Sequence, residues 1–346
     1  MTILKILEGL VSIKSLTSDA LMCKFLLEKL SKVVPTSKYL SSSNVLIWGH
    51  TDLRTSKWLI NTHIDVVPGN KNQFTLEVHG DRAIGRGTAD TKGSVAVLVY
   101  KAHEWHRIAQ EKGITFMLVS DEEIGGESTK KALNIMNNLK GAIFLEPTCL
   151  QIVTEAKGMM QIKITSTGVS SHGSRPWDGD NAIERLMREL IQFRLTHPSP
   201  SVETKDSTYN FSLINGGNAI NQVPSRAELW CDIRFNPAVD PNLIVTLMKD
   251  TFKSCDVTVV KNESPIHCDR NTRLFQMLSK SLKASSINPL TKFDHGTSDA
   301  RHATALGIPA LVIGPKGSGL HSDNEWVSLK SLERLSCILD HWINNI

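Results

Sequence analysis

The chain lacks the features that mark membrane-spanning, secreted and nucleic-acid-binding proteins. No uninterrupted apolar run is long enough to span a bilayer. Residues 1–30 carry apolar side chains at helical spacing, but Lys5, Glu8 and Lys14 interrupt them, so the segment does not resemble a signal peptide. The net charge is only +4, and lysine and arginine are scattered rather than gathered into runs that bind phosphate backbones. We therefore expect a cytoplasmic protein that begins with one helix and binds neither membranes nor nucleic acid.

Cysteine is sparse, and its spacing argues against two kinds of site. No C-x-x-C occurs, and the six cysteines are widely separated: Cys23, Cys149, Cys231, Cys255, Cys268 and Cys337. Such spacing suggests neither a disulfide framework nor a thiolate zinc site. We expect these side chains to be buried apolar residues, which is the usual behaviour of free cysteine.

What the chain does contain is the alternating pattern of an α/β protein. With 346 residues, 40% of them hydrophobic, it is long enough for two domains with separate cores. Apolar runs rich in β-branched residues predict strands at 57–64, 113–120, 141–145 and 307–313, and helical spacing predicts helices at 91–106 and 127–139. This alternation favours a layered domain with a mostly parallel sheet.

Residues 156–265 follow a different order. The pattern predicts strand 161–166, helix 181–195, strands 209–214 and 227–234, helix 241–252 and strand 257–261. This βαββαβ order is the ferredoxin-like unit. Because the α/β pattern resumes afterwards, we expect a catalytic domain formed by 1–155 and 266–346, with 156–265 inserted into it.

Several possible metal ligands fall at or just beyond the predicted strands' carboxyl ends. Loops converge and ligands bind at that edge of an open parallel sheet. A single histidine or glutamate there is ordinarily a solvated loop residue, but several at one edge indicate a site. Imidazole and carboxylate without thiolate suit zinc or another borderline divalent ion such as cobalt or manganese. The candidates are His63 with Asp65, Asp90, Glu122, Glu123, Glu146 and His321.

Asp90 is the candidate for a carboxylate shared by two ions. Two metal ions about 3.5 to 4 Å apart clamp both the nucleophile and the polarised carbonyl oxygen, and a bridging carboxylate relieves their repulsion. Asp90 lies in G-R-G-T-A-D-T-K-G at 85–93, where glycines let the backbone turn closely around an ion. The segment matches neither a dinucleotide G-x-G-x-x-G nor a P-loop.

The acidic triplet at 121–123 directly follows a predicted strand. Adjacent residues on an extended backbone point in opposite directions, so one carboxylate can bind metal while its neighbour faces water. A base so placed takes the proton of the attacking water and returns it to the leaving amine. The competing interpretation is a solvated acidic loop.

Seven segments spread over nearly the whole chain form a recognisable set. They are T-H-I-D-V-V-P at 62–68, G-R-G-T-A-D-T-K-G-S at 85–94, S-D-E-E-I-G-G at 120–126, L-E-P-T at 145–148, G-V-S-S-H-G-S-R-P at 168–176, G-T-S-D-A-R at 296–301 and G-P-K-G-S-G-L-H-S-D-N-E at 314–325. In content and order they resemble the M20 metallopeptidases, with the acetylornithine deacetylase and succinyl-diaminopimelate desuccinylase group nearest.

The resemblance implies a centre of two divalent ions, with zinc as the first expectation. His63 and Glu146 would hold one ion, Glu123 and His321 the other, and Asp90 would bridge them. Two further carboxylates would act beside the ions. Asp65 would orient the imidazole of the first ion, and Glu122 would be the general acid/base.

The resemblance also implies that the inserted domain is the dimerisation or lid domain. His172 would reach the partner subunit's site and support the oxyanion. Asn221 and Arg234 would contact the substrate's amide and carboxylate, although Arg234 also fits a surface arginine at a strand end. The positions that would line the substrate pocket are Gly296, Thr297 and Ser298.

Two departures from the desuccinylases bear on the substrate. Those enzymes carry an arginine pair before the glycine that matches Gly158, where this chain has Ala156 and Lys157. They also carry an asparagine where Gly317 stands here. Both positions concern recognition of the succinyl substrate, and neither concerns catalysis.

We expect an N-acyl-amino-acid deacylase, acting as a homodimer on a small substrate of amino-acid biosynthesis. A metallocarboxypeptidase or dipeptidase on the same scaffold is the alternative. A catalytically inactive binding protein would have lost a ligand or Glu122, and none is lost. A nucleic-acid-binding regulator would need a basic stripe, which is not found.

Overall fold

The computed structural model describes residues 1–346, which divide into two compact units. The first unit comprises Met1–Glu155, His267–Phe293 and Ser298–Ile346, and the second comprises Ala156–Ile266 and Asp294–Thr297. The short segment 294–297 of the second unit was not indicated by the sequence pattern. None of the helices combines the length and apolar character that crossing a membrane requires.

The first unit is built on a nine-stranded mixed sheet in the order β1-β2-β6-β3-β7-β15-β8-β13, with β14 paired to β8. Its central strands β6, β3, β7 and β15 are parallel, and antiparallel strands lie at both edges. The parallel strands are buried along their whole length, which explains why they read as continuous apolar runs. The strands of this sheet are β1 (Lys38–Leu40), β2 (Val45–Gly49), β3 (Trp58–His63), β6 (Ile114–Val119), β7 (Gly141–Phe144), β8 (Ile152–Ala156), β13 (Ile266–His267), β14 (Thr291–Asp294) and β15 (Ala310–Val312).

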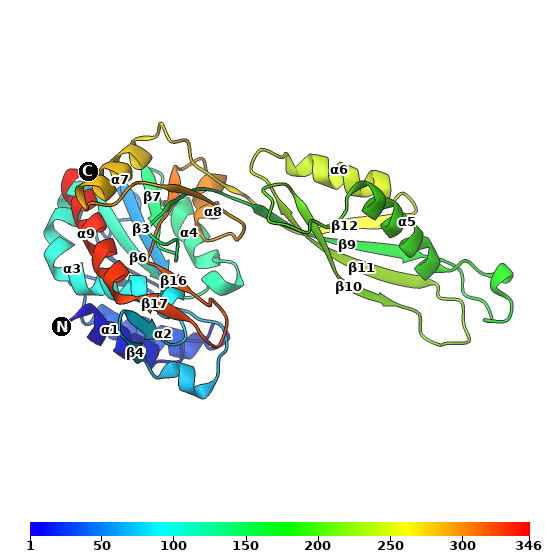
Figure 1. The fold of residues 1–346 in the computed structure, drawn as a ribbon, viewed down its shortest axis with the longest axis horizontal. Coiled ribbons are helices and arrows are strands. Elements are labelled where there is room, and N and C mark those ends of the chain that lie inside the picture. Colours follow the sequence, from blue (N-terminus) through cyan, green and yellow to red (C-terminus); the bar gives the residue numbers. More distant parts are fainter. The chain divides into compact units, whose positions relative to one another are not determined.

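Helices cover both faces of this sheet. Figure 1 shows α3 and α9 on one side of the central strands, and α4 and α8 on the other. The prediction of one N-terminal helix is wrong: the chain breaks between α1 and α2, and Asp19 caps α2 by accepting a hydrogen bond from the Met22 amide. The helices of this unit are α1 (Ile3–Val11), α2 (Ala20–Ser31), α3 (Gly93–Lys112), α4 (Glu127–Ile135), α7 (Arg273–Ala284), α8 (Ala300–Ala305) and α9 (Leu329–Asn345).

A small antiparallel sheet in the order β16-β17-β5-β4 joins two distant parts of the chain. Its strands are β4 (Glu77–His79), β5 (Arg82–Ile84), β16 (Gly317–Ser318) and β17 (Trp326–Ser328). Strands of two or three residues are too short for a hydrophobic alternation, so the sequence did not predict them. The sheet places the turn after β5 beside the loop between β16 and β17, where the Gly85 amide donates to the Glu325 carbonyl oxygen at 3.0 Å.

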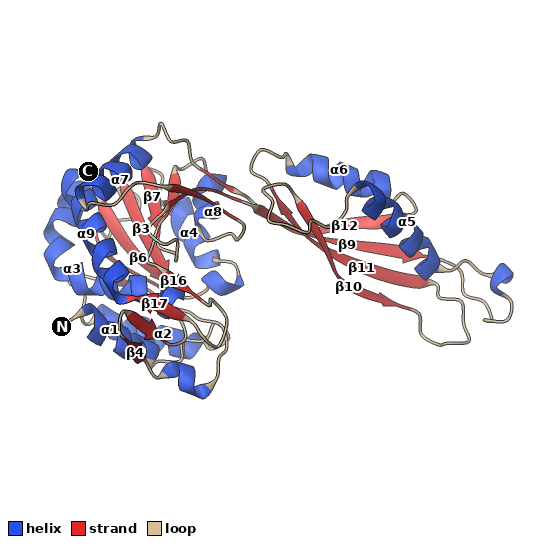
Figure 2. Cartoon of the chain, in the orientation of Figure 1, coloured by secondary structure: helices blue, strands red, loops and turns tan.

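The second unit has the predicted βαββαβ order and its own core. Its antiparallel sheet runs β10-β11-β9-β12, and α5 and α6 pack on one face (Figure 2). Burial alternates along β9 and β11, as expected for a sheet covered on one side. The elements are β9 (Gly158–Thr167), α5 (Ala182–Thr196), β10 (Thr208–Gly216), β11 (Arg226–Phe235), α6 (Pro241–Thr251) and β12 (Cys255–Glu263).

The cysteines are free, but only some of them fill the core. Cys23, Cys231 and Cys268 are buried as expected. Cys149 and Cys337 are exposed, so the prediction of buried cysteines is wrong for these two. Cys337 lies on the outward side of α9, and Cys149 lies in the connection that follows β7.

Candidate metal centre

Three adjacent parallel strands bring predicted ligands to one edge of the large sheet. His63 is the last residue of β3, and Glu146 lies two residues beyond β7. Glu123 lies in the 3₁₀ turn η3 (Glu122–Ile124), which follows β6. Since β6, β3 and β7 are neighbours in the sheet, their carboxyl ends place these side chains together.

Two loops complete the set of ligands. Asp90 lies in the turn η2 (Thr88–Lys92), directly before α3, and the peptide bond between Asp90 and Thr91 is cis. His321 lies between β16 and β17 and has a left-handed backbone with φ 61°. The five predicted ligands thus come from five separate segments.

The five side chains form two triads that share Asp90. One triad is His63, Asp90 and Glu146, the other is Asp90, Glu123 and His321, and within each the candidate ligand atoms lie within 4.8 Å of one another. Asp90 turns Oδ1 toward His63 Nε2, at 3.0 Å. It turns Oδ2 toward His321 Nε2, at 3.3 Å. A different oxygen therefore faces each triad, which is the arrangement that a bridging carboxylate needs.

The remaining contacts close each triad. Glu146 Oε2 lies 3.9 Å from His63 Nε2. Glu123 Oε2 lies 3.1 Å from His321 Nε2. These donors are imidazole nitrogens and carboxylate oxygens, a set that suits borderline divalent ions.

Asp65 contacts the other nitrogen of the His63 ring. The Asp65 carbonyl oxygen lies 3.0 Å from His63 Nδ1, and its Oδ1 lies 3.4 Å away. Oδ2 accepts hydrogen bonds from the Thr17 hydroxyl at 3.1 Å and the Glu123 amide at 3.3 Å. Such contacts leave Nε2 of His63 facing the triad, as metal-binding histidines require.

The side chains of Glu122 and Glu123 point in different directions, but the backbone between them is not the one that the sequence predicted. The expected extended backbone is wrong here, because residues 122–124 form a 3₁₀ turn. Successive side chains of a 3₁₀ turn point about 120° apart, so the two carboxylates still point in different directions. Glu123 joins a triad, whereas Glu122 belongs to neither, and its Oε1 lies 3.8 Å from Arg301 Nη1.

Burial raises the pKa of three glutamates at this edge. It raises the pKa of Glu122 to about 8 and of Glu123 to about 7, and nearby acidic groups add to both. It raises the pKa of Glu146 well above the usual range. Carboxylates crowded and desolvated in this way are stabilised by a bound cation, so the electrostatics also fit divalent ions.

The histidines and the shared aspartate are shifted by one another. Burial raises the pKa of Asp90, but hydrogen bonds from His321 and His63 outweigh it, and the net pKa is well below the usual range. Burial lowers the pKa of His63, yet its contacts with Asp65 and Asp90 raise it more. The hydrogen bond to Asp90 is the main cause that raises the pKa of His321 to about 9.

Sequence reasoning gave no role to four buried residues around this edge: Arg86, Asp299, Arg301 and Glu325. Arg301 Nη2 donates to the Gly125 carbonyl oxygen at 2.7 Å, which fixes the end of η3. Gly126, with φ 63°, leaves space that the Asp299 carboxylate occupies, so a side chain there would clash. All four residues lie inside the matched motifs, which was the signal that could have indicated them.

The predicted substrate residues lie mostly in the second unit. His172 is exposed and its Nδ1 lies 2.9 Å from the Ser174 hydroxyl. Asn221 is also exposed, and its carbonyl oxygen accepts from the Gly173 amide at 2.7 Å, so these two loops adjoin. Arg234, near the end of β11, donates from Nε to Asp232 Oδ1 at 2.7 Å. Gly296 and Thr297 belong to the second unit, and Ser298 begins the next segment of the first.

A pocket of about 240 Å³ in the second unit surrounds Arg234. Lys157 and His295 also line it, so three potential cations meet there. Lys157 is 2% exposed, and its Nζ donates to the Asp206 carbonyl oxygen at 2.6 Å. Glu203 lies on the same pocket and contacts His295 at 2.8 Å.

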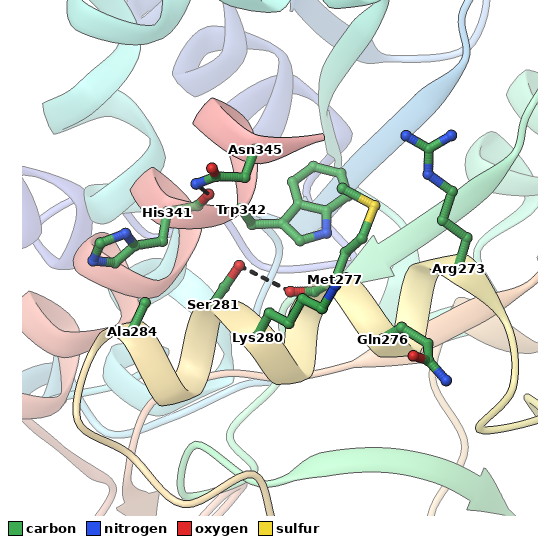
Figure 3. A pocket seen from close by; sticks show the side chains of 9 residues that line it. All are labelled: Arg273, Gln276, Met277, Lys280, Ser281, Ala284, His341, Trp342 and Asn345. Atoms are coloured by element: carbon green, nitrogen blue, oxygen red, sulfur yellow. Dashed lines mark hydrogen bonds between the residues drawn. The ribbon is translucent and has the colours of Figure 1, made fainter.

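A larger pocket of about 540 Å³ lies between α7 and α9 (Figure 3). Its lining includes Arg273, Lys280 and His341 around the buried indole of Trp342, and no acidic residue. It contains none of the predicted site residues. This pocket is therefore separate from the candidate metal centre.

Comparison with known proteins identifies the family. Residues 59–345 match the model of peptidase family M20/M25/M40. The chain belongs to this family. It is accordingly a hydrolase of amide bonds from a metal-dependent, typically dinuclear family.

Relatives within the family differ in their named substrates. A LysW-lysine/LysW-ornithine hydrolase of Sulfurisphaera tokodaii is 26% identical over 337 residues, which cover 95% of this chain and 91% of that protein. An acetylornithine deacetylase of Proteus mirabilis is 28% identical, covering 84% and 80%. A probable succinyl-diaminopimelate desuccinylase of Staphylococcus aureus is 27% identical, covering 62% and 63%.

The fold agrees with solved structures of the family. The crystal structure of a tripeptidase from Staphylococcus aureus superposes with a TM-score of 0.80 over 99% of this chain and 96% of that one, at 20% identity. At this identity the likeness concerns the fold. It confirms the predicted α/β architecture.

Proposed function

We propose that the protein removes the acyl group from a small N-acyl amino acid, with two divalent ions at the two triads and Glu122 as general acid/base. The observation that carries this proposal is the position of Asp90, whose two carboxylate oxygens face different histidines at 3.0 and 3.3 Å. A single ion would need only one of these triads. A shared carboxylate between two triads supports a dinuclear centre, with zinc as the first candidate and cobalt or manganese as alternatives.

The ions and Glu122 have different roles in the proposed reaction. Bound divalent ions supply Lewis-acid polarisation of the scissile carbonyl and lower the pKa of water. Glu122 takes the proton of the attacking water on its carboxylate and delivers it to the leaving amine. The Arg301 guanidinium lies 3.8 Å from the Glu122 carboxylate.

The named substrates of the relatives support a proposal on the substrate class. Ornithine, lysine and diaminopimelate are diamino acids, and the relatives' names give them as acetyl, LysW or succinyl conjugates. We propose an N-acyl diamino acid for this chain as well. Arg234 would bind the α-carboxylate, since a planar guanidinium matches a carboxylate with two parallel hydrogen bonds that lysine cannot reproduce. It would have to exchange its present contact with Asp232 for that role.

We expect an acetyl substrate to be hydrolysed faster than a succinyl substrate, because of the residue at position 157. Lys157 stands where the desuccinylases carry an arginine, and its ammonium group is already bonded to a backbone carbonyl. A succinyl carboxylate without a matching partner loses roughly 1 to 3 kcal/mol on burial. That corresponds to turnover lower by about ten- to a hundred-fold.

In the second unit, His172 is proposed to act in the partner subunit's site of a homodimer. Its exposed position on a loop beside Asn221 is compatible with this role. The residues Gly296, Thr297 and Ser298 are proposed to line the substrate pocket.

A substrate panel tests the proposed function. Acetylornithine, succinyl-diaminopimelate, LysW-lysine and a set of di- and tripeptides are assayed with added zinc, cobalt or manganese, and Glu122→Gln serves as the inactive control. Hydrolysis of an acylated diamino acid, abolished by chelator and by the control substitution, is expected. Cleavage of peptides alone would favour the metallocarboxypeptidase or dipeptidase alternative. A clear preference for the succinyl over the acetyl substrate would contradict the role given to Lys157.

A further inference from the structure

Glu325 is a buried carboxylate that touches the turn carrying the bridging aspartate. It directly precedes β17 and is 1% exposed. Its Oε1 accepts hydrogen bonds from the backbone amides of Ala89 at 3.0 Å and Asp90 at 3.1 Å. Its Oε2 accepts from the Gly87 amide and from Arg86 Nη1, both at 2.9 Å. Four N–H donors therefore converge on one side chain.

Arg86 extends these contacts to two further segments of the metal centre. Its side chain is 2% exposed. Nη2 donates to the Pro68 carbonyl oxygen at 3.2 Å and to the His321 carbonyl oxygen at 3.4 Å. The pair thus joins the turn of Asp90, the loop of His321 and the segment that follows His63 and Asp65.

Neither residue is itself a candidate ligand. Glu325 belongs to neither triad, and its two oxygens are fully occupied by donors from residues 86–90. What the pair controls is the backbone from which Asp90 projects. Without an acceptor, three buried amides of this turn would lack partners, which a folded protein avoids by rearranging the turn.

We propose that Glu325, together with Arg86, is a positioning pair that holds the turn of Asp90 and the loop of His321 in their binding geometry before any metal arrives. The inference rests on the proposed function, because it assigns a role toward the two ions. A carboxylate is required because both of its oxygens accept, whereas an amide would turn donors toward the Gly87 or Asp90 amides. Charge-assisted bonds also make this contact stronger than a neutral acceptor would.

Metal affinity separates positioning from a merely structural role. Glu325→Gln keeps the size of the side chain but replaces one of its two hydrogen-bond-accepting oxygens with an NH₂ donor. The affinity of the chelator-stripped protein for zinc or cobalt is therefore expected to fall about 10- to 100-fold. Titration calorimetry measures the affinity, and thermal unfolding of the metal-free protein measures stability separately. A structural role alone would lower the unfolding temperature and leave the affinity of the folded protein unchanged.

Asp81→Asn is the matched control. Asp81 also accepts hydrogen bonds from the segment that follows Glu325, from the Ser328 hydroxyl at 2.6 Å and the Lys330 amide at 2.8 Å. Its side chain bonds to residues 328 and 330 and not to residues 86–90, so its substitution should leave metal affinity at the wild-type level. Equal losses in both variants would contradict the proposal.

Hydrogen exchange on the wild-type protein keeps the test decisive if Glu325→Gln does not fold. The amides of residues 87, 89 and 90 should be protected in the metal-free protein, because the carboxylate and not the metal holds them. Rapid exchange of these amides without metal would overturn the proposal, as would a folded Glu325→Gln protein with wild-type affinity. If the wild-type protein bound no divalent ion at all, the proposed function would fail instead, and the exchange result would still report on the turn.

Discussion

The two triads share Asp90 but differ in depth. In the first, the side chains of His63 and Glu146 are 1% and 18% exposed, and both residues lie at or just beyond the end of a strand of the large sheet. In the second, Glu123 is 8% exposed but His321 is 55% exposed and projects from a loop. We call these the deep triad and the shallow triad.

The two triads therefore differ in how firmly the protein holds its metal ligands before an ion binds. In the deep triad, strand ends and the contact with Asp65 fix the imidazole before metal binds, so little conformational entropy is lost on binding. In the shallow triad, the exposed His321 side chain must be ordered by the ion and by its loop. We therefore expect the deep triad to bind its ion more tightly, and the shallow triad to lose its ion first.

The largest expected effect concerns the carboxylate that belongs to neither triad. Glu122→Gln should lower turnover by about a hundred- to ten-thousand-fold while both ions remain bound, because it removes proton transfer only. Glu123→Gln should instead release the shallow ion. Steady-state kinetics with elemental analysis of the same preparations measures both. Wild-type rates in both variants would show that these roles are misassigned.

A smaller effect should fall mainly on the deep triad. Asp65→Asn weakens the orientation of His63 and should reduce the affinity of the tighter ion about 10- to 100-fold. Asp121→Asn is the control, since Asp121 accepts from the Ser128 amide and hydroxyl and does not contact either histidine. Calorimetric titration resolves the two binding steps. An Asp65→Asn protein whose tighter step is unaltered would contradict the orienting role.

Metal binding at the shallow triad should depend on pH. In the metal-free protein the raised pKa of His321, about 9, means that the imidazole keeps its proton below that pH, and an incoming ion must displace it. Affinity for the weaker ion should therefore rise with pH between about 7 and 9, with proton release. Calorimetry in buffers of different ionisation enthalpy counts the protons. Affinity that is flat over this range would exclude the displacement.

The smallest expected signal is complementation between subunits. Mixed dimers of a His172→Ala chain and a Glu122→Gln chain should recover part of the wild-type activity, because one of the two sites then has both residues. The control is a mixture in which each chain carries both substitutions. No recovery in verified mixed dimers would count against action across the subunit boundary.

Much of the deep triad could be predicted from the sequence, because local pattern and topology agree there. Long apolar runs predicted β3, β6 and β7, and residues at the carboxyl ends of neighbouring parallel strands must meet. His63 and Glu146 followed directly from that reasoning. The pairing of these residues with particular ions came from the family resemblance and stays a prediction.

The shallow triad was harder to predict, because its geometry depends on long-range contacts. The strands beside His321 have two or three residues and no readable alternation. The four N–H donors around Glu325 lie more than two hundred residues before it in the chain. The Arg301 side chain that bonds the end of the turn at Glu122 lies 176 residues after Gly125. The contact of Arg234 with Asp232, which lie two residues apart on one strand, was also missed. The sequence suggested only a surface arginine or a substrate contact at position 234.

The most direct test of the central claim is the number of ions bound with and without the shared carboxylate. The wild-type chain is loaded with zinc, desalted and analysed for metal per chain, alongside Asp90→Asn. The account predicts two ions per wild-type chain, loss of activity in chelator, and loss of both ions, or retention of one weakly bound ion, in Asp90→Asn. A wild-type protein that carries no ion and keeps full activity in chelator, or an Asp90→Asn protein that still binds two ions tightly, would contradict it.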